Sequence, residues 1–362
     1  MTTNGHNWPG PPKENRALGS GPISFAMSEP HYAAHWIPVW SRLKNRGKFY
    51  AHNIHHGYLV SQGVPERDLE NFPNLRMRGG TRQAQRGRTS RTRTNNDIIL
   101  VAASGDYQSA NRHFGHKIFV EHGCGISYGN RHPSYAGGTG RRSVGLFLCP
   151  NEYVAKLNRQ YYPAATSAIV GDPYLDKHMA APKKDPGDKP LVVISFHWPA
   201  KFAAEAGWAF PEYEQVLPEL AKRFKIAGHC HPRVASVMAQ NFRKAGIPFI
   251  ADFDRVMLEA DIYAVDNSST LYEFAATDRP VVAMNSAKYR RDVNHGLRFW
   301  EHSEVGFNCD FPADLADTID LALLDPPSQK ERRHAATAAV FPVLGNATDA
   351  AVDAIESWRA TL

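Results

Sequence analysis

The 362-residue sequence has little cysteine, no long apolar segment and none of the common glycine-rich nucleotide motifs. Its four cysteines form no Cys-x-x-Cys pair, which argues against a disulfide framework and against a structural zinc site. No stretch approaches the ~18 uncharged apolar residues of a membrane-spanning helix. Because neither Gly-x-Gly-x-x-Gly nor Gly-x-x-x-x-Gly-Lys-Ser/Thr occurs, dinucleotide-dependent redox chemistry and P-loop chemistry are disfavoured.

Acidic residues are absent from residues 76–93, whereas seven arginines there exceed the whole formal net charge of +6. These are Arg76, Arg78, Arg82, Arg86, Arg88, Arg91 and Arg93. The segment has no apolar face, so we expect it to be mobile when free. It could bind an anionic membrane surface, a polyanionic acceptor or nucleic acid, or it could be a solvated loop without a partner.

The chain is longer than one hydrophobic core usually supports, which predicts two domains. Short apolar runs alternate with helical stretches, a pattern typical of α/β domains with doubly wound parallel sheets. We expect a flexible segment at 1–30, a first domain at 31–180 and a linker at 181–190. A second domain at 191–345 and a helix at 346–362 that crosses back to the first domain would follow. Residues 1–30 lack the apolar core of a signal peptide, which favours a cytoplasmic protein.

The pattern predicts most of the regular elements from residue 98 onward. Strands are expected at 98–102, 117–121, 144–149 and 167–170, and then at 191–195, 224–227, 248–250, 261–265 and 280–284. Helices are expected at 213–223, 234–245, 254–259, 270–277, 313–324 and 347–361.

Ligands of open α/β sheets bind beyond the carboxyl ends of the strands, so polar residues in those positions are candidates for a site. Ser268 and Ser269 follow the strand at 261–265 and precede a helix, an arrangement that suits a diphosphate. The alternative is a capping box made by Thr270 and Glu273, which needs no ligand. The motif His231-Pro232-Arg233 could bind phosphate oxygens, or Pro232 could simply start a helix.

Two further candidate sites lie just after strands. One is the loop around His122 in the first domain, and the other is His197 after the first strand of the second domain. His122 is a candidate general base, and Gly123 and Gly125 would let the backbone approach a ligand closely. The alternative is a glycine-rich turn with a hydrogen-bonded histidine. His197 could contact a phosphate or a base, whereas its neighbour Trp198 is expected to pack on the sheet. In an extended strand Cys230 would point away from its two histidine neighbours, so a metal site is not expected there.

Taken in order, these motifs resemble the CDP-glycerol glycerophosphotransferase family of teichoic-acid synthesis, over about residues 97–300. The resemblance lies in five segments. They are His122-Gly123, residues 148–153 (Leu-Cys-Pro-Asn-Glu-Tyr), residues 171–176 (Gly-Asp-Pro-Tyr-Leu-Asp), His231-Pro232-Arg233, and residues 260–269 followed by Tyr272-Glu273-Phe274 and Arg279-Pro280. The resemblance implies the GT-B glycosyltransferase fold, in which two Rossmann-like domains face a cleft, the first binding the acceptor and the second the nucleotide donor.

The resemblance also implies roles for individual residues. His122 would activate an acceptor hydroxyl, while His231, Ser268 and Ser269 would bind the diphosphate of a CDP- or other nucleotide-activated donor. Glu273 would bind ribose hydroxyls. Independently of the resemblance, Arg233 and His197 are candidates to contact that diphosphate because they lie just after strands. No metal or cofactor is implied.

The transferred group would be glycerol phosphate or a sugar or polyol phosphate. The acceptor would be a polymer, a glycan or a lipid-linked molecule, which would place the enzyme in the cytoplasm or at the inner face of the membrane. The sequence departs from the family at Cys124-Gly125, at His197-Trp198-Pro199 and at Asn267. A GT-B glycosyltransferase, a nucleotide-sugar epimerase and a nucleic-acid-binding protein that uses residues 76–93 therefore stay open as alternatives.

Overall fold

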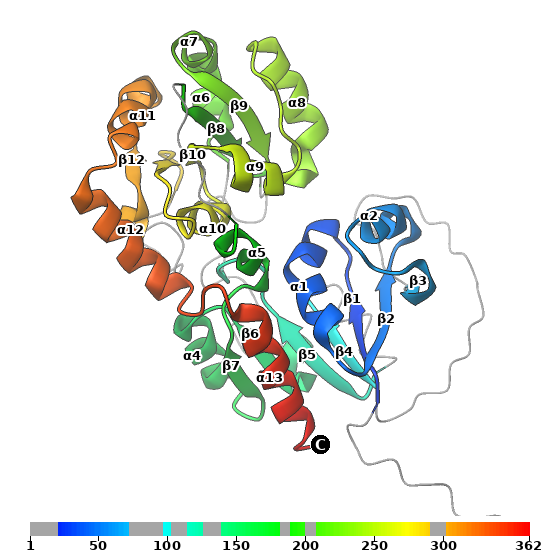
Figure 1. Ribbon diagram of the computed structural model, residues 1–362. Helices are drawn as coiled ribbons and strands as arrows, with labels where there is room; N and C mark the ends of the chain where they lie inside the picture. The colour runs from blue at the N-terminus through cyan, green and yellow to red at the C-terminus, as the bar shows by residue number, and fades with distance from the viewer. Residues whose placement is uncertain are drawn as a thin grey trace, which may run out of the picture.

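The computed structural model describes residues 21–71, 97–102, 114–125, 139–181, 189–199, 208–289 and 302–362. The arginine-rich segment 76–93 and residues 182–188 of the predicted linker lie outside these ranges. The described strands form two separate parallel sheets with helices packed around them (Figure 1). The predicted α/β fold with two doubly wound domains is therefore confirmed.

The first sheet contains seven described strands in the order β3-β2-β1-β4-β5-β6-β7. They are β1 (Ile23–Ala26), β2 (Arg46–Ala51), β3 (Leu69–Asn71), β4 (Ile98–Val101), β5 (His116–Val120), β6 (Leu146–Cys149) and β7 (Thr166–Ile169). The helices of this half are α1 (Pro30–Arg42), α2 (His56–Ser61), α4 (Glu152–Tyr161) and α5 (Asp176–Met179). The strand order reverses direction between β1 and β4, and such a switch point is where ligands of this architecture bind.

The second sheet contains five described strands in the order β12-β11-β10-β8-β9. They are β8 (Leu191–Phe196), β9 (Lys225–Cys230), β10 (Ile262–Val265), β11 (Val281–Met284) and β12 (Phe307–Cys309). The surrounding helices are α6 (Phe210–Tyr213), α7 (Leu217–Arg223), α8 (Ala235–Lys244), α9 (Phe253–Glu259), α10 (Thr270–Ala275) and α11 (Leu315–Leu323). Here the order reverses at β8, so the loops after β8 and β10 flank the second switch point.

Three predictions about the elements need correction. Residues 23–26, which were assigned to a flexible segment, form strand β1 between β2 and β4. All four side chains of this strand are buried. The strand predicted at 248–250 is only an isolated bridge between Gly228 and Phe249, since Pro248 has no N–H for a ladder. The helix predicted at 213–223 is shorter, since α7 begins only at Leu217 after a 3₁₀ turn at Glu214–Val216, and Pro218 lies in the first turn of α7.

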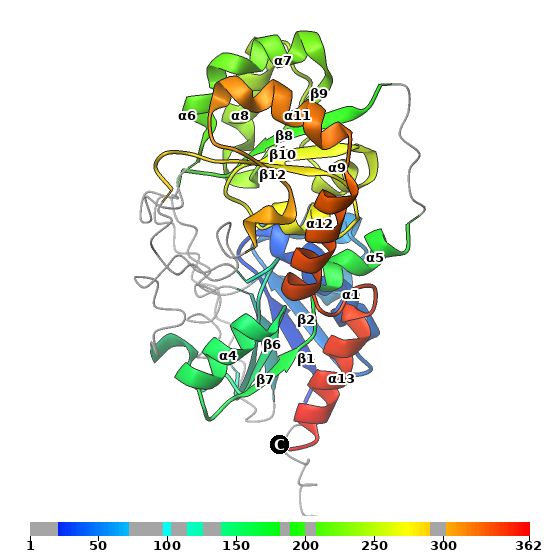
Figure 2. The same cartoon turned by 90° about the vertical axis from the view of Figure 1, so that its left-hand side faces the viewer.

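The end of the chain returns to the first domain. Helix α12 (Pro327–Val340) runs from the second sheet toward the first, and α13 (Ala347–Arg359) lies along the first domain (Figure 2). Ile355 and Trp358 of α13 pack into the apolar core that includes β1 and α1.

A second apolar cluster combines Cys124 and Tyr174 of the first half with Val265 and Leu271 of the second. The two halves therefore share a packed interface. Within the described ranges no helix is both long and apolar enough to cross a membrane.

Candidate active site

Histidines from the two halves meet where the carboxyl ends of their strands face one another. His122 follows β5, and its ring centroid lies 6.0 Å from that of His31 in the first turn of α1. The His31 ring lies 5.3 Å from the ring of His231, which follows β9 of the second sheet. His197, which follows β8, lies 5.1 Å from His231. The structure thus brings together predicted residues of both domains, with His31 between them.

The loop after β5 is seated on the start of α10 in the second domain. Gly123 has a φ of +63°, and a Cβ atom there would lie 2.6 Å from Ser269 Oγ and 2.7 Å from Glu273 Oε1. Ser269 Oγ donates a hydrogen bond of 3.0 Å to Glu273 Oε1. The close approach predicted for this glycine is therefore made to side chains of the other domain.

Gly125 has a different role from Gly123. A Cβ atom at Gly125 would lie 2.5 Å from Val154 Cγ2 and 3.1 Å from Pro150 Cγ, both in the first domain. Its left-handed φ of +75° and this tight packing explain why glycine occupies the position. The approach of a ligand to Gly125 stays an untested prediction.

The start of α10 does not form the capping box that the sequence suggested. Helix α10 begins at Thr270, and the Glu273 carboxylate accepts from the Ser269 hydroxyl instead of returning to a backbone N–H at the cap. Ser268 Oγ accepts from the Thr270 N–H at 3.3 Å and from its hydroxyl at 2.9 Å. The two serines therefore present hydroxyl groups at the end of β10, as the diphosphate hypothesis requires, although their binding role stays a prediction.

Pro232 starts a 3₁₀ turn (Pro232–Val234) with His231 at its N-cap, as the structural alternative predicted, whereas phosphate binding by this motif stays a prediction. Nδ1 of His231 accepts from the Arg233 N–H at 3.2 Å, which leaves Nε2 as the nitrogen that can meet a ligand. The Arg233 guanidinium lies 4.8 Å above the Trp198 ring and forms a 2.8 Å ion pair with Glu29 of the first domain. Arg233 thus bridges the two halves beside the histidines.

The loop that carries His197 is fixed by a buried carboxylate. Asp266, at the end of β10, accepts from the His197 N–H at 2.7 Å and from the Ala209 N–H at 2.9 Å. Nearby, His229 pairs with the Ser195 hydroxyl at 2.9 Å, while Cys230 packs into an apolar cluster. Across the described part of the chain, no group of three histidine, cysteine or acidic side chains is arranged to hold a metal ion.

Burial keeps the central imidazoles neutral. Burial, together with the smaller effect of the neighbouring His35, lowers the pKa of His122 to about 4. Burial and the charges of neighbouring histidines hold the pKa values of His31 and His231 well below the ordinary value. Nδ1 of His122 is buried without a hydrogen-bond partner among the described residues. A neutral imidazole with an unused nitrogen can accept a proton near pH 7, as a general base must.

Two further residues of the site, His35 and Asp172, escaped the sequence analysis. His35 Nδ1 lies 2.8 and 3.0 Å from the two carboxylate oxygens of Asp172, and both side chains are buried. Burial opposes a charge on His35, but Asp172 raises its pKa above the ordinary value. The His35 ring lies 6.4 Å from the His122 ring, and burial raises the pKa of the nearby Glu273 to about 7. A charged histidine–aspartate pair therefore lies behind the neutral His122.

Asp172→Asn is expected to lower the free energy of unfolding by about 1–3 kcal/mol at pH 5.5, because a buried charged hydrogen bond is lost. The raised folded pKa of His35 means that this stabilisation is complete below about pH 6.5 and disappears as the pH rises through the folded value. Urea unfolding at several pH values should therefore show a difference that shrinks toward pH 9. In a His35→Gln background the same substitution should have little pH-dependent effect; an equal effect in both backgrounds would rule the pair out as its source.

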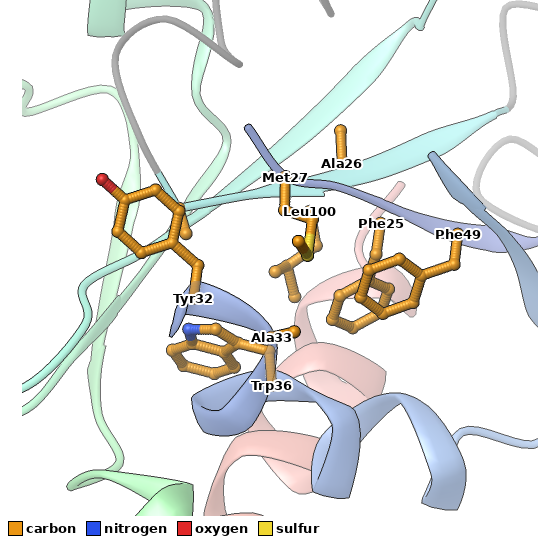
Figure 3. A pocket seen from close by; sticks show the side chains of 9 residues that line it. Phe25, Ala26, Met27, Tyr32, Ala33, Trp36, Phe49 and Leu100 are labelled. Atoms are coloured by element: carbon orange, nitrogen blue, oxygen red, sulfur yellow. The ribbon is translucent and has the colours of Figure 1, made fainter. Parts of the chain in front are cut away.

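A small cavity lies behind Tyr32, whose ring is 4.5 Å from the ring of His122. Figure 3 shows that apolar side chains line it, including Phe25, Met27 and Trp36, and that the Tyr32 hydroxyl points away from Phe25. Its volume of about 10 Å³ has room for roughly one water molecule. The cavity is therefore a packing space beside the site and cannot hold a nucleotide.

No protein-family model and no curated protein matches the sequence. Several solved structures share the fold. A putative UDP-N-acetylglucosamine 2-epimerase from Listeria monocytogenes is 12% identical, with a TM-score of 0.60 over 94% of this chain and 97% of that one. S. aureus MnaA in a co-structure with UDP is 14% identical, with a TM-score of 0.59 over 94% and 98% of the two chains. The wall teichoic acid polymerase TagF is 14% identical, with a TM-score of 0.58 over 94% and 89%.

These similarities confirm the predicted GT-B fold of two Rossmann-like domains. They include a protein of teichoic-acid synthesis, to which the sequence motifs pointed, together with epimerases. At these identities the likeness is one of fold.

Proposed function

We propose that this chain is a transferase that moves glycerol phosphate, or a sugar or polyol phosphate, from a nucleotide-diphosphate-activated donor to an acceptor hydroxyl. The observation that carries the proposal is the meeting of His122 with His31 and His231 at the facing carboxyl ends of the two sheets. The base comes from one domain and the diphosphate-binding residues come from the other.

In this reaction the acceptor oxygen forms a bond to the β-phosphorus of the donor while His122 takes the hydroxyl proton. The bond from that phosphorus to the bridging oxygen breaks, and the nucleoside monophosphate leaves with the electron pair. Hydrogen bonds from the His231 imidazole and from the Ser268 and Ser269 hydroxyls would stabilise the charge that develops on the leaving phosphate. Transfer of a sugar would use the same residues, with a nucleoside diphosphate as the leaving group.

A nucleotide-sugar epimerase is the second candidate, because structures named as epimerases share the fold over nearly the whole chain. The two activities differ in their need for an acceptor. An epimerase converts the donor when it is alone, whereas a transferase releases nucleotide in proportion to the acceptor supplied. Incubation of the protein with UDP-N-acetylglucosamine alone, followed by product analysis, distinguishes them.

Calorimetric titration with CDP, UDP and GDP is expected to give saturable heat for at least one of them. Substrates of enzymes commonly bind in the range of about 1 μM to 1 mM. The matching nucleosides, which lack the phosphates, should bind much more weakly because the proposed contacts are to the diphosphate. If none of the three nucleotides binds, the proposed function is wrong, and selectivity among them would identify the class of donor.

A further inference from the structure

His31 lies at the centre of the histidine cluster, although the predicted chemistry assigns it no role. Its ring is 5.3 Å from that of His231 and 6.0 Å from that of His122, so it touches both the proposed base and the proposed diphosphate ligand. Its Nδ1 atom is buried and has no hydrogen-bond partner among the described residues. An unpaired buried nitrogen is costly unless a ligand pairs with it.

The position of His31 in the fold supports a role in ligand binding. It follows β1, the strand at which the order of the first sheet reverses, and it lies in the first turn of α1. Residues in the loops after such a switch strand commonly contact the ligand. On the opposite side of the interface, His197 and Asp266 occupy the equivalent loops of the second sheet.

The carboxylates around His31 already have partners. Glu29, at the N-cap of α1, pairs with Arg233, and Asp172 pairs with His35. Glu273 accepts from Ser269, and burial raises its pKa to about 7. The remaining groups that face His31 are imidazoles or a guanidinium, namely His35 of α1, His122 from the β5 loop, and His231 and Arg233 from the β9 loop. No described carboxylate is therefore left to balance a charge on His31.

We propose that His31 is a second imidazole ligand of the donor diphosphate, opposite His231, and that binding of the diphosphate is accompanied by proton uptake at His31. This inference rests on the proposed function, since it takes the nucleotide donor as the ligand. His231 would donate from Nε2 without gaining a proton, because its Nδ1 already accepts from the Arg233 N–H. A diphosphate diester carries two negative charges, which match an imidazolium at His31 and the guanidinium of Arg233. Charge-assisted hydrogen bonds to phosphate oxygens then replace the missing partner of His31.

Calorimetry with CDP-glycerol and UDP-N-acetylglucosamine tests the proposal, because the phosphates of these diesters do not titrate near neutral pH. Titrations at pH 7 in HEPES and in Tris, which have different ionisation enthalpies, count the protons taken up on binding. The wild-type protein should take up about one proton with the donor that binds. His31→Gln should take up about one proton fewer and bind that donor about tenfold more weakly.

His334→Gln is the matched control, since it removes an exposed imidazole of α12 and should change neither quantity. If a donor binds and His31→Gln takes up as many protons as the wild type, this inference is wrong while the proposed function stands. If neither donor nor any nucleotide binds the wild type, the proposed function itself fails and this inference falls with it.

The wild-type protein also provides a test that does not depend on the folding of a variant. One imidazole that gains a proton on binding makes the logarithm of the association constant fall with pH at a slope close to −1 between about pH 5.5 and 8. An association constant that does not change over this range would overturn the proton uptake at His31.

Discussion

His122→Ala is expected to slow transfer by about 10²- to 10⁴-fold, the usual cost of removing a general base. The position of the residue supports this size of effect, since His122 follows β5 at the interface of the two domains and has a buried Nδ1 atom without a described partner. Burial lowers the pKa of His122 to about 4, so the imidazole is unprotonated at neutral pH and its free nitrogen is available for the acceptor's proton. The measurement is the rate of nucleotide release with saturating donor and acceptor.

Donor binding separates loss of the base from loss of the fold. His122 is proposed to serve the acceptor, so His122→Ala and the closer-sized His122→Gln should bind nucleotide nearly as well as the wild type. The pH profile adds a further check. A base with a pKa of about 4 predicts that activity limited by His122 falls only as the pH decreases toward 4. Transfer within about tenfold of the wild type in both variants would exclude His122 as the base.

Much of the fold can be predicted from the sequence because most of its strands are continuous apolar runs. β4, β5, β8 and β10 are buried along nearly their whole length, as strands covered on both faces must be. β3 and β12 have three residues each, too few to show a period. β1 was missed because its four residues follow a segment rich in proline, glycine and asparagine.

Because β1 was not predicted, the helix that follows it was missed too, and with it the site residues His31 and His35. Helix α1 has a proline at its start and another, Pro38, in its interior, which interrupts the usual helical signal. Its buried positions Tyr32, Trp36, Val39 and Trp40 nevertheless follow the spacing of one helical face. That pattern, placed after a short strand, was the signal that could have identified His31 and His35. The pairing of His35 with Asp172 joins residues 137 positions apart and could not be read from local sequence.

The contact between Gly123 and Ser269 likewise depends on how the two domains meet, and it leads to the second large effect. Gly123→Ala is expected to lower kcat/KM by about 100-fold or more. The new Cβ would lie 2.9 Å from Ser269 Cβ and 2.7 Å from Glu273 Oε1. Ser269 Cβ is close to the backbone of α10, so it cannot move aside without shifting the start of that helix. The shift would displace His122 from His231, and misplacement by about 1 Å can cost 10²-fold in rate.

Gly246→Ala is a matched control for the backbone part of this effect. Gly246 has a φ of +75°, similar to the +63° of Gly123, but a Cβ atom there meets nothing within 4 Å. Both substitutions should therefore lose about 1–2 kcal/mol of stability from the left-handed backbone, whereas Gly123→Ala alone should lose activity. Thermal unfolding and steady-state kinetics on the two variants measure the two quantities separately. Equal activities would mean that the contact between Gly123 and Ser269 does not position His122, the proposed base, because the backbone cost is common to both variants.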